Sequence, residues 1–208
     1  MTQLKELLVE QLQNLLHAET QLTGSLPKMG DAARHPKLRE AFEKHLAQTE
    51  VHVERLRQAL ELLGEKAQPK VCKSMLGLVE EGVETISEGR GKQPLAADLA
   101  LIAAAQRVEH YEISAYGTAK CLARQIGEIM CARLLSQTLG EEQSTDFLMS
   151  AISDPILQQA ALDDMGADVD LEGVGDFGRA GRSRAQSVSK NREEQLTAAW
   201  ARRDTHHE

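Results

Sequence analysis

The sequence predicts an all-α protein built on a bundle of four long helices. Its composition supports this fold class, because Leu, Ala, Glu, Gln and Lys favour helix and aromatic residues make up only 3% of the chain. Apolar residues recur at steps of three and four through four long stretches, which is the spacing of one face of an α-helix. The sequence lacks the alternating runs of β-branched residues that indicate strands.

The first long helix is predicted from about Thr2 to Leu26 or a little beyond, and the second over residues 36–63. Pro27 stands near the end of the first helix, and Pro36 suits the first turn of the second. Gly64 is a typical residue just beyond the end of a helix. The connection between the two helices is short, so we expect them to form an antiparallel pair.

The other two long helices are predicted over residues 94–124 and from about Gly127 to the residue before Asp154. They too have a short connection and are expected to pair. Asp154 and Pro155 suit the cap and first turn of a further small helix, which would reach Met165.

A long link, residues 65–93, separates the second and third long helices. The apolar spacing from Val71 to Ile86 predicts a short helix inside it. Four-helix bundles in which one long crossover joins two closely connected pairs have the ferritin-like arrangement. The sequence therefore predicts a ferritin-like bundle over residues 1–165.

Residues 166–208 differ in composition, with several glycines and a small run of arginines. We expect a flexible tail, with a short helix around Leu196 and Trp200. The tryptophan is the candidate anchor for a protein partner of this tail.

The net charge of −8 makes a general role in binding nucleic acid unfavourable. The chain has no apolar run near 18 residues and no signal-peptide pattern at its start, so we expect a cytoplasmic protein without a membrane segment. Its three cysteines lack paired metal-type spacing, which indicates reduced thiols. Apolar residues outside the main stripes, among them Leu7, Leu16, Ala104 and Ala105, indicate a homodimer.

A glutamate interrupts the apolar stripe of the first helix. Leu12 and Leu15 precede Glu19 at steps of three and four, and Leu22 follows it three residues later. An ionised carboxylate in an apolar stripe is costly in free energy unless it is paired or binds a metal ion. Glu19 is therefore a candidate metal ligand, and a buried Lys or Arg partner is the structural alternative.

The same anomaly occurs in the third and fourth long helices. Glu109 lies in the stripe of the third, and Glu112 shares its face three residues later. Glu142 lies in the stripe of the fourth, and Asp146 follows one turn later. Glutamates in three separate seams favour metal binding over three independent ion pairs.

The second long helix offers two histidines, His45 and His52. They lie on one side of the helix but two turns apart, so we do not expect one metal ion to bind both directly. Carboxylates and histidines converging inside a helical bundle are the ligand set of a di-iron or di-manganese site. The Glu-x-x-His pattern of such sites is absent, because Thr49 stands three residues before His52 and Thr145 three after Glu142. The sequence therefore leaves open whether the site binds one metal ion or two.

Four sequence motifs resemble those of a known family. They are LLHAETQL at 15–22, HLAQTEVHVERL at 45–56, AQRVEHYEISAYG at 105–117 and TLGEEQSTD at 138–146. Together they resemble the YciE/YciF family of bacterial ferritin-like stress proteins over about residues 2–165. The third motif is the most specific of the four.

This resemblance implies a rubrerythrin-like bundle, often dimeric, with a di-iron site and a link to general stress responses. The ligands that it implies are four glutamates and one histidine of the second helix: Glu19, Glu109, Glu112 and Glu142, with His52 or His45. Ferritin-like di-iron proteins usually have an acid where Thr49 stands, which leaves the second metal ion open. The chain also lacks the Cys-x-x-Cys pattern of a rubrerythrin electron-donor centre.

Three functions follow as hypotheses, and they leave open whether the protein is an enzyme. The first is a non-haem protein with two iron ions, or manganese in their place, that reacts with oxygen or hydrogen peroxide in stress protection. Peroxidase, catalase-like and ferroxidase chemistry all fit such a site. The second is a non-enzymatic stress or assembly protein with a structural metal ion, and the third is an iron-storing mini-ferritin.

Overall fold

The computed structural model describes residues 2–164 and is helical through most of this range. Its elements are α1 (Gln3–Ala32), α2 (Pro36–Leu62), α3 (Lys73–Gly89), α4 (Pro94–Gln125) and α5 (Ile129–Asp164). No strand occurs within residues 2–164. The predicted all-α, ferritin-like bundle with a helix in its long crossover is confirmed. The predicted tail, residues 166–208, lies outside the described residues.

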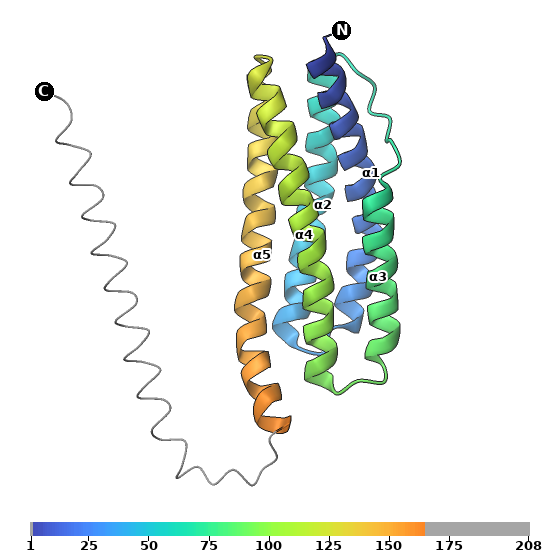
Figure 1. Ribbon diagram of the computed structural model, residues 1–208, viewed down its shortest axis with the longest axis vertical. Coiled ribbons are helices and arrows are strands. Elements are labelled where there is room, and N and C mark those ends of the chain that lie inside the picture. The colour runs from blue at the N-terminus through green and yellow to red at the C-terminus, as the bar shows by residue number, and fades with distance from the viewer. Residues whose placement is uncertain (1, 165–208) are drawn as a thin grey trace, which may run out of the picture. The chain divides into compact units, whose positions relative to one another are not determined.

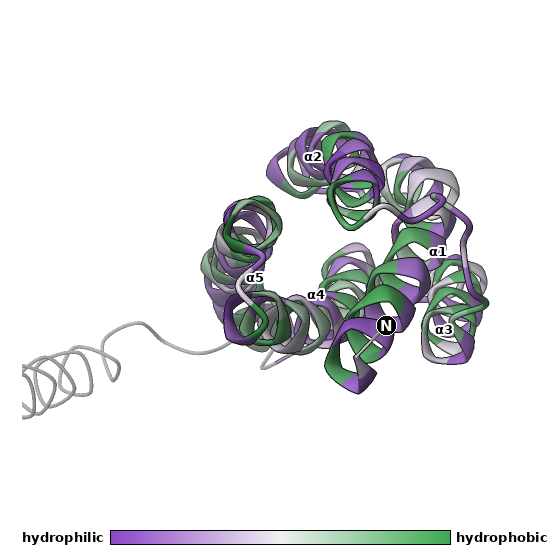
Figure 2. Cartoon of the chain, turned by 90° about the horizontal axis from the view of Figure 1, so that it is seen from above, coloured by the Kyte–Doolittle hydropathy of each residue, from purple (hydrophilic) through white to green (hydrophobic). Residues whose placement is uncertain are grey.

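The four long helices form two antiparallel pairs, α1 with α2 and α4 with α5 (Figure 1). α2 ends at the end of the bundle where α1 begins, and the following link and α3 bring the chain to the opposite end, where α4 starts. α3 lies outside the four-helix arrangement, beside α1 and α4 (Figure 2). None of the described helices is long and apolar enough to cross a membrane.

The helix ends follow from local chemistry. The Thr2 side chain accepts a hydrogen bond from the main-chain N–H of Lys5 and so caps α1. α2 and α4 each begin with a proline, whose missing N–H needs no partner in the first turn. Gly64 and Gly127, with φ of 74° and 82°, supply the left-handed conformation just beyond α2 and α4.

Two prolines do not end their helices, which corrects the predicted boundaries. α1 continues past Pro27 to Ala32, and α5 runs unbroken through Pro155, so the separate small helix does not exist. In α5, Ile152 and Ile156 are both buried on either side of the proline. A continuous helix buries both isoleucines on one face, which offsets the hydrogen bond that the proline removes.

A buried carboxylate ties α4 to the α1–α2 connection. Asp98 accepts the main-chain N–H of Arg34 at 2.9 Å and that of His35 at 2.7 Å, one at each oxygen. These two donors lie in the turn between the helices, where no helical carbonyl is available to them. Asp98 therefore fixes the first helix pair against the second.

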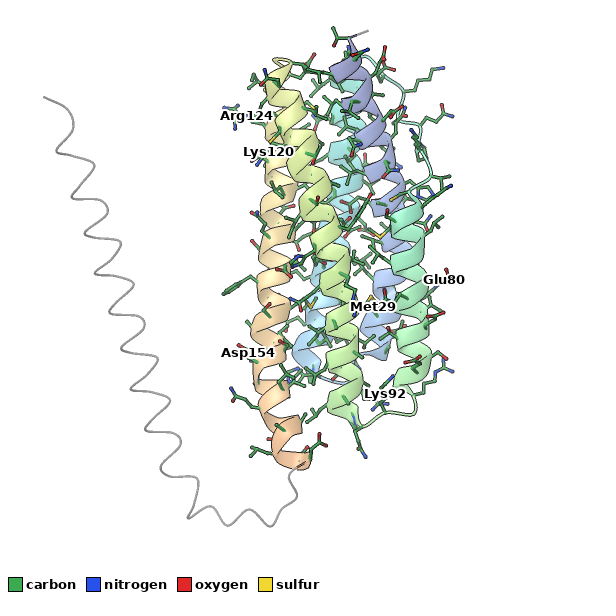
Figure 3. All side chains as sticks on the ribbon, viewed as in Figure 1. Met29, Glu80, Lys92, Lys120, Arg124 and Asp154 are labelled. Carbon is green, nitrogen blue, oxygen red and sulfur yellow. The ribbon has the colours of Figure 1, made fainter. Side chains whose placement is uncertain are left out.

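The interior consists of two apolar clusters with a polar layer between them. One cluster contains Leu22, Phe42, Val108 and Met149, and the other contains Leu15, Val53, Tyr116 and Leu139. Apolar segments face the interior in Figure 2, whereas the charged side chains of Glu80 and Asp154 point away from the bundle (Figure 3). In each long helix, the residues between its two apolar stretches fall in the polar layer.

The apolar residues that indicated a homodimer are mostly covered within the chain. Leu16, Ala104 and Ala105 are buried, and only Leu7 is exposed. Ala104 and Ala105 belong to the cluster that includes Met75 of the crossover helix, so packing within one chain accounts for them. The homodimer remains a prediction.

Candidate metal centre

Six ionisable side chains meet in the polar layer of the bundle, and each of them is at most 2% exposed. They come from all four long helices: Glu19 from α1, His45 and His52 from α2, Glu109 and Glu112 from α4, and Glu142 from α5. The structure thus brings together six of the seven residues that the sequence pattern selected. The layer contains no Lys or Arg among its fully buried residues, so the structural alternative of a buried Lys or Arg partner is not realised within residues 2–164.

The first group of potential ligands consists of His45, Glu109, Glu112 and Glu142. Each offers one atom, and these atoms all lie within 4.8 Å of one another. His45 Nε2 lies 3.2 Å from Glu109 Oε1 and 3.8 Å from Glu142 Oε2. One metal ion could occupy the space among such atoms.

The second group consists of Glu19, His52 and Glu142, whose ligand atoms satisfy the same 4.8 Å limit. His52 Nδ1 lies 3.3 Å from Glu19 Oε1 and 2.9 Å from Glu142 Oε1. Glu142 belongs to both groups and offers a different oxygen to each histidine. The two histidines therefore serve separate groups, which is why their spacing of two turns fits the site.

The chemistry of the donor set fits a pair of cations. Both oxygens of Glu112 are buried and have no hydrogen-bond partner within residues 2–164, and the same holds for Glu19 Oε2 and Glu109 Oε2. Carboxylate oxygens without a donor are costly in an interior. Four carboxylates would balance two divalent cations with both imidazoles neutral, and oxygen with imidazole donors suits iron and manganese.

Five groups of the cluster hold protons strongly when no metal ion is bound. Burial raises the pKa of Glu112 and of Glu19, and raises the pKa of Glu109 to about 7. Burial alone would lower the pKa of each histidine. Contacts with the glutamates outweigh it and raise the pKa of His45 to about 9 and that of His52 to about 10. Protons and metal ions therefore compete for the same groups of the cluster.

Tyr116 closes the side of the cluster next to Glu19. Its hydroxyl donates to Glu19 Oε1 at 2.5 Å, and its ring is in edge contact with the His52 ring, with centroids 6.4 Å apart. Burial raises the pKa of Tyr116 well above its ordinary value, so the phenol stays protonated. Tyr116 thus holds one oxygen of Glu19 in place and leaves the other free.

Asp146 is the candidate that the structure does not bring to the cluster. Its carboxylate accepts a hydrogen bond from Gln106 at 3.0 Å and lies 3.3 Å from His110 Nε2. It is 24% exposed, unlike the six cluster residues. Its partners on α4 lie toward solvent, so the short side chain turns outward rather than toward Glu142.

Sequence reasoning missed the residues that surround the histidines. Thr145 Oγ1 lies 3.3 Å from His45 Nδ1, and Glu141 Oε2 lies 2.7 Å from His52 Nε2. Arg55 in turn binds Glu141. All three lie in the recognised motifs. Thr145 lies on the buried face of α5, whereas Arg55 and Glu141 lie beside the buried faces of their helices, and the contacts that connect all three to the histidines depend on how α2 and α5 are placed side by side.

The fold and the cluster define a ferritin-like helical bundle whose buried His/Glu cluster could hold metal ions. The model of the family described as "Domain of unknown function (DUF892)" matches residues 3–162. The chain therefore belongs to this family.

Relatives with solved structures share the fold. Protein YciF of Escherichia coli K12 is 39% identical over 154 residues, which cover 74% of this chain and 92% of that protein. The crystal structure of the E. coli stress protein YciF matches with a TM-score of 0.72 and 38% identity, over 76% of this chain and 99% of that one.

A structure of YcfI from Rhodopseudomonas palustris, described as a candidate structural protein, matches with a TM-score of 0.68. It is 33% identical over 72% of this chain and 94% of that one. The resemblance to the YciE/YciF family is confirmed by the E. coli relative, and a stress-related family fits the chain.

Proposed function

We propose that the protein is a non-haem metalloprotein that binds two iron ions, with manganese as the alternative, and reacts with oxygen or hydrogen peroxide in stress protection. The observation that carries the proposal is the buried cluster itself. Its four glutamates come from three helices, and Glu112 has two oxygens without a hydrogen-bond partner among the described residues. The stress protein YciF of E. coli, a relative by sequence and fold, supports the physiological setting.

Each residue of the cluster has a role in this proposal. His45, Glu109 and Glu112 would hold one ion, Glu19 and His52 the other, and Glu142 would contribute one oxygen to each. When bound, two adjacent iron ions supply electrons for reducing the O–O bond of oxygen or hydrogen peroxide. The apolar clusters above and below the layer exclude bulk water and restrict access to small reactants.

Metal analysis after anaerobic reconstitution with Fe(II) or Mn(II) tests the proposal. We expect about two ions per wild-type chain. Glu142→Ala should lose both, because it removes the residue shared by the two groups, whereas Glu109→Ala should lose mainly the ion held with His45. Glu80→Ala, which removes an exposed carboxylate on α3, is the matched control and should bind as wild type does. Wild-type protein that stays metal-free would refute the proposal.

Reactivity is tested separately, by mixing the anaerobic Fe(II) protein with hydrogen peroxide or oxygen and recording the absorption spectrum. A rapid change in wild type and none in Glu142→Ala is the expected result. The description of YcfI as a structural protein favours a second function for this chain, a non-enzymatic one in which the metal ion supports the structure. In that case metal ions would bind and raise the melting temperature, and neither reactant would change the spectrum.

A further inference from the structure

The two ring nitrogens of His52 face different surroundings. Nδ1 faces the cluster, 2.9 Å from Glu142 and 3.3 Å from Glu19. Nε2 faces outward, 2.7 Å from Oε2 of Glu141. Glu141 is not part of either potential ligand group, and its side chain is 32% exposed. Among the cluster residues, its carboxylate is hydrogen-bonded to His52.

The Glu141 carboxylate is itself held in place. Arg55 binds it with both terminal nitrogens, Nη1 to Oε2 at 2.5 Å and Nη2 to Oε1 at 3.0 Å. Arg55 Nη1 also donates to Thr138 Oγ1 at 3.3 Å. A two-pronged contact of this kind fixes the plane of a carboxylate as well as its position. Glu141 is thus oriented before it meets His52.

His45 is connected to the same residue by another route. The Thr145 hydroxyl donates to the main-chain carbonyl of Glu141 at 3.1 Å, so its oxygen is left to accept from His45 Nδ1–H at 3.3 Å. The other nitrogen of His45, Nε2, faces Glu109 and Glu142. Both histidines therefore have an acceptor for the outward N–H and direct the remaining nitrogen into the cluster.

We propose that two residues of α5 position the histidines: Glu141 positions His52 through its carboxylate, and Thr145, held by the main-chain carbonyl of residue 141, positions His45. The inference rests on the proposed metal binding. A neutral imidazole binds a metal ion only through the nitrogen that carries no hydrogen. An acceptor on the outward N–H fixes which nitrogen that is and the direction in which it points. Loss of such a partner typically weakens metal binding about 10- to 100-fold.

Variants of Glu141 test the first route, with Fe(II) affinity measured anaerobically by competition with a chelator. Glu141→Ala should weaken binding of one ion by about 10- to 100-fold. Glu141→Gln keeps an oxygen that can accept from His52 and should recover part of this loss. Glu54→Ala is the matched control, since Glu54 forms an exposed ion pair with Arg57 on α2 and does not contact the cluster. It should bind both ions as wild type does.

The second route is tested with Thr145→Val and Thr145→Ser. Valine removes the hydroxyl at nearly constant volume and should weaken the ion held with His45, whereas serine keeps the hydroxyl and should restore binding. Proton NMR of the Co(II)-substituted protein gives a readout that a merely structural role would not change. The outward ring N–H of a bound histidine should give a shifted, slowly exchanging signal in wild type. The His52 signal should disappear in Glu141→Ala and remain in Glu54→Ala.

The possible failures are distinguishable. Glu141→Ala that binds both ions with wild-type affinity and keeps the His52 signal would overturn the positioning role and leave the proposed function intact. Equal losses in Glu141→Ala and Glu141→Gln, accompanied by equal losses of melting temperature without metal, would also overturn it in favour of a structural role. Wild-type protein that binds neither Fe(II) nor Co(II) would overturn the proposed function and this inference together.

Discussion

At the scale of single residues, the cluster links proton binding to folding. In the metal-free protein, the pKa values of Glu19, Glu109 and Glu112 are raised from 4.5, and those of His45 and His52 from 6.5. All five groups thus bind protons more tightly in the folded chain than in the unfolded chain. Each of the five groups therefore lowers the free energy of unfolding as the pH rises.

The melting temperature of the metal-free protein should consequently decrease between about pH 5 and about pH 9. The window begins near the unfolded pKa of the carboxyl groups and extends toward the folded pKa values of the histidines, about 9 and about 10. Calorimetry in chelator-containing buffers provides the measurement. A melting temperature that rises or stays constant across this window would contradict the prediction.

A bound metal ion should oppose the fall in melting temperature with rising pH, because it takes the place of the protons. We expect the rise in melting temperature caused by Fe(II) or Mn(II) to increase with pH over the same range, with proton release on binding measurable in weakly buffered solution. Glu112→Gln removes one group whose pKa burial raises and should flatten the pH dependence of the metal-free protein.

At the scale of single helices, the continuity of α5 gives a stability prediction. Pro155 lies inside the helix, where it removes one main-chain hydrogen bond and crowds the preceding turn. Pro155→Ala should therefore raise the free energy of unfolding, by up to about 3 kcal/mol. Urea unfolding monitored by circular dichroism measures the change.

Pro36 provides the matched control for this substitution. It is the first residue of α2, where a missing N–H has no cost, so Pro36→Ala should not stabilise the protein. If the two substitutions had the same effect, α5 would not be continuous at Pro155 in solution.

At the scale of the whole molecule, the bundle should retain its properties without the tail. Residues 170–208 lie outside the described range, and few of them carry large apolar side chains that could be buried. Deleting them should leave the metal content and the melting temperature nearly unchanged. A large fall in melting temperature would show instead that the segment around Trp200 binds to the bundle.

The homodimer is a second prediction at this scale. Several large apolar side chains are exposed on the bundle, including Leu7 at 41% and Phe147 at 74%. Covering such side chains with a second copy would remove apolar surface from water, which favours association. Sedimentation velocity at micromolar concentration should give the mass of two chains, and a sedimenting species with the mass of one chain, 22.9 kDa, would contradict the prediction.

The class of fold and the positions of the buried glutamates could be predicted from the amino-acid sequence. Helical periodicity is a local property, so a carboxylate in an apolar stripe can be recognised within one helix, as at Glu19, Glu109 and Glu142. The crossover helix and the short connections were likewise readable from spacing and from the turn residues. The continuation through Pro27 and Pro155 was not, because it depends on what the residues beyond each proline pack against.

The grouping of the polar residues depends on how the helices pack against one another. Whether His45 or His52 joins a given glutamate depends on the rotation and axial position of one helix relative to another, which periodicity within a helix does not contain. The packing of α5 against α2 places Glu142 between the two histidines and brings Glu141 to His52. The packing of α5 against α4 brings Asp146 to Gln106 and His110. Each of these contacts joins residues far apart in the chain. Their geometry is therefore set by the packing of the whole bundle.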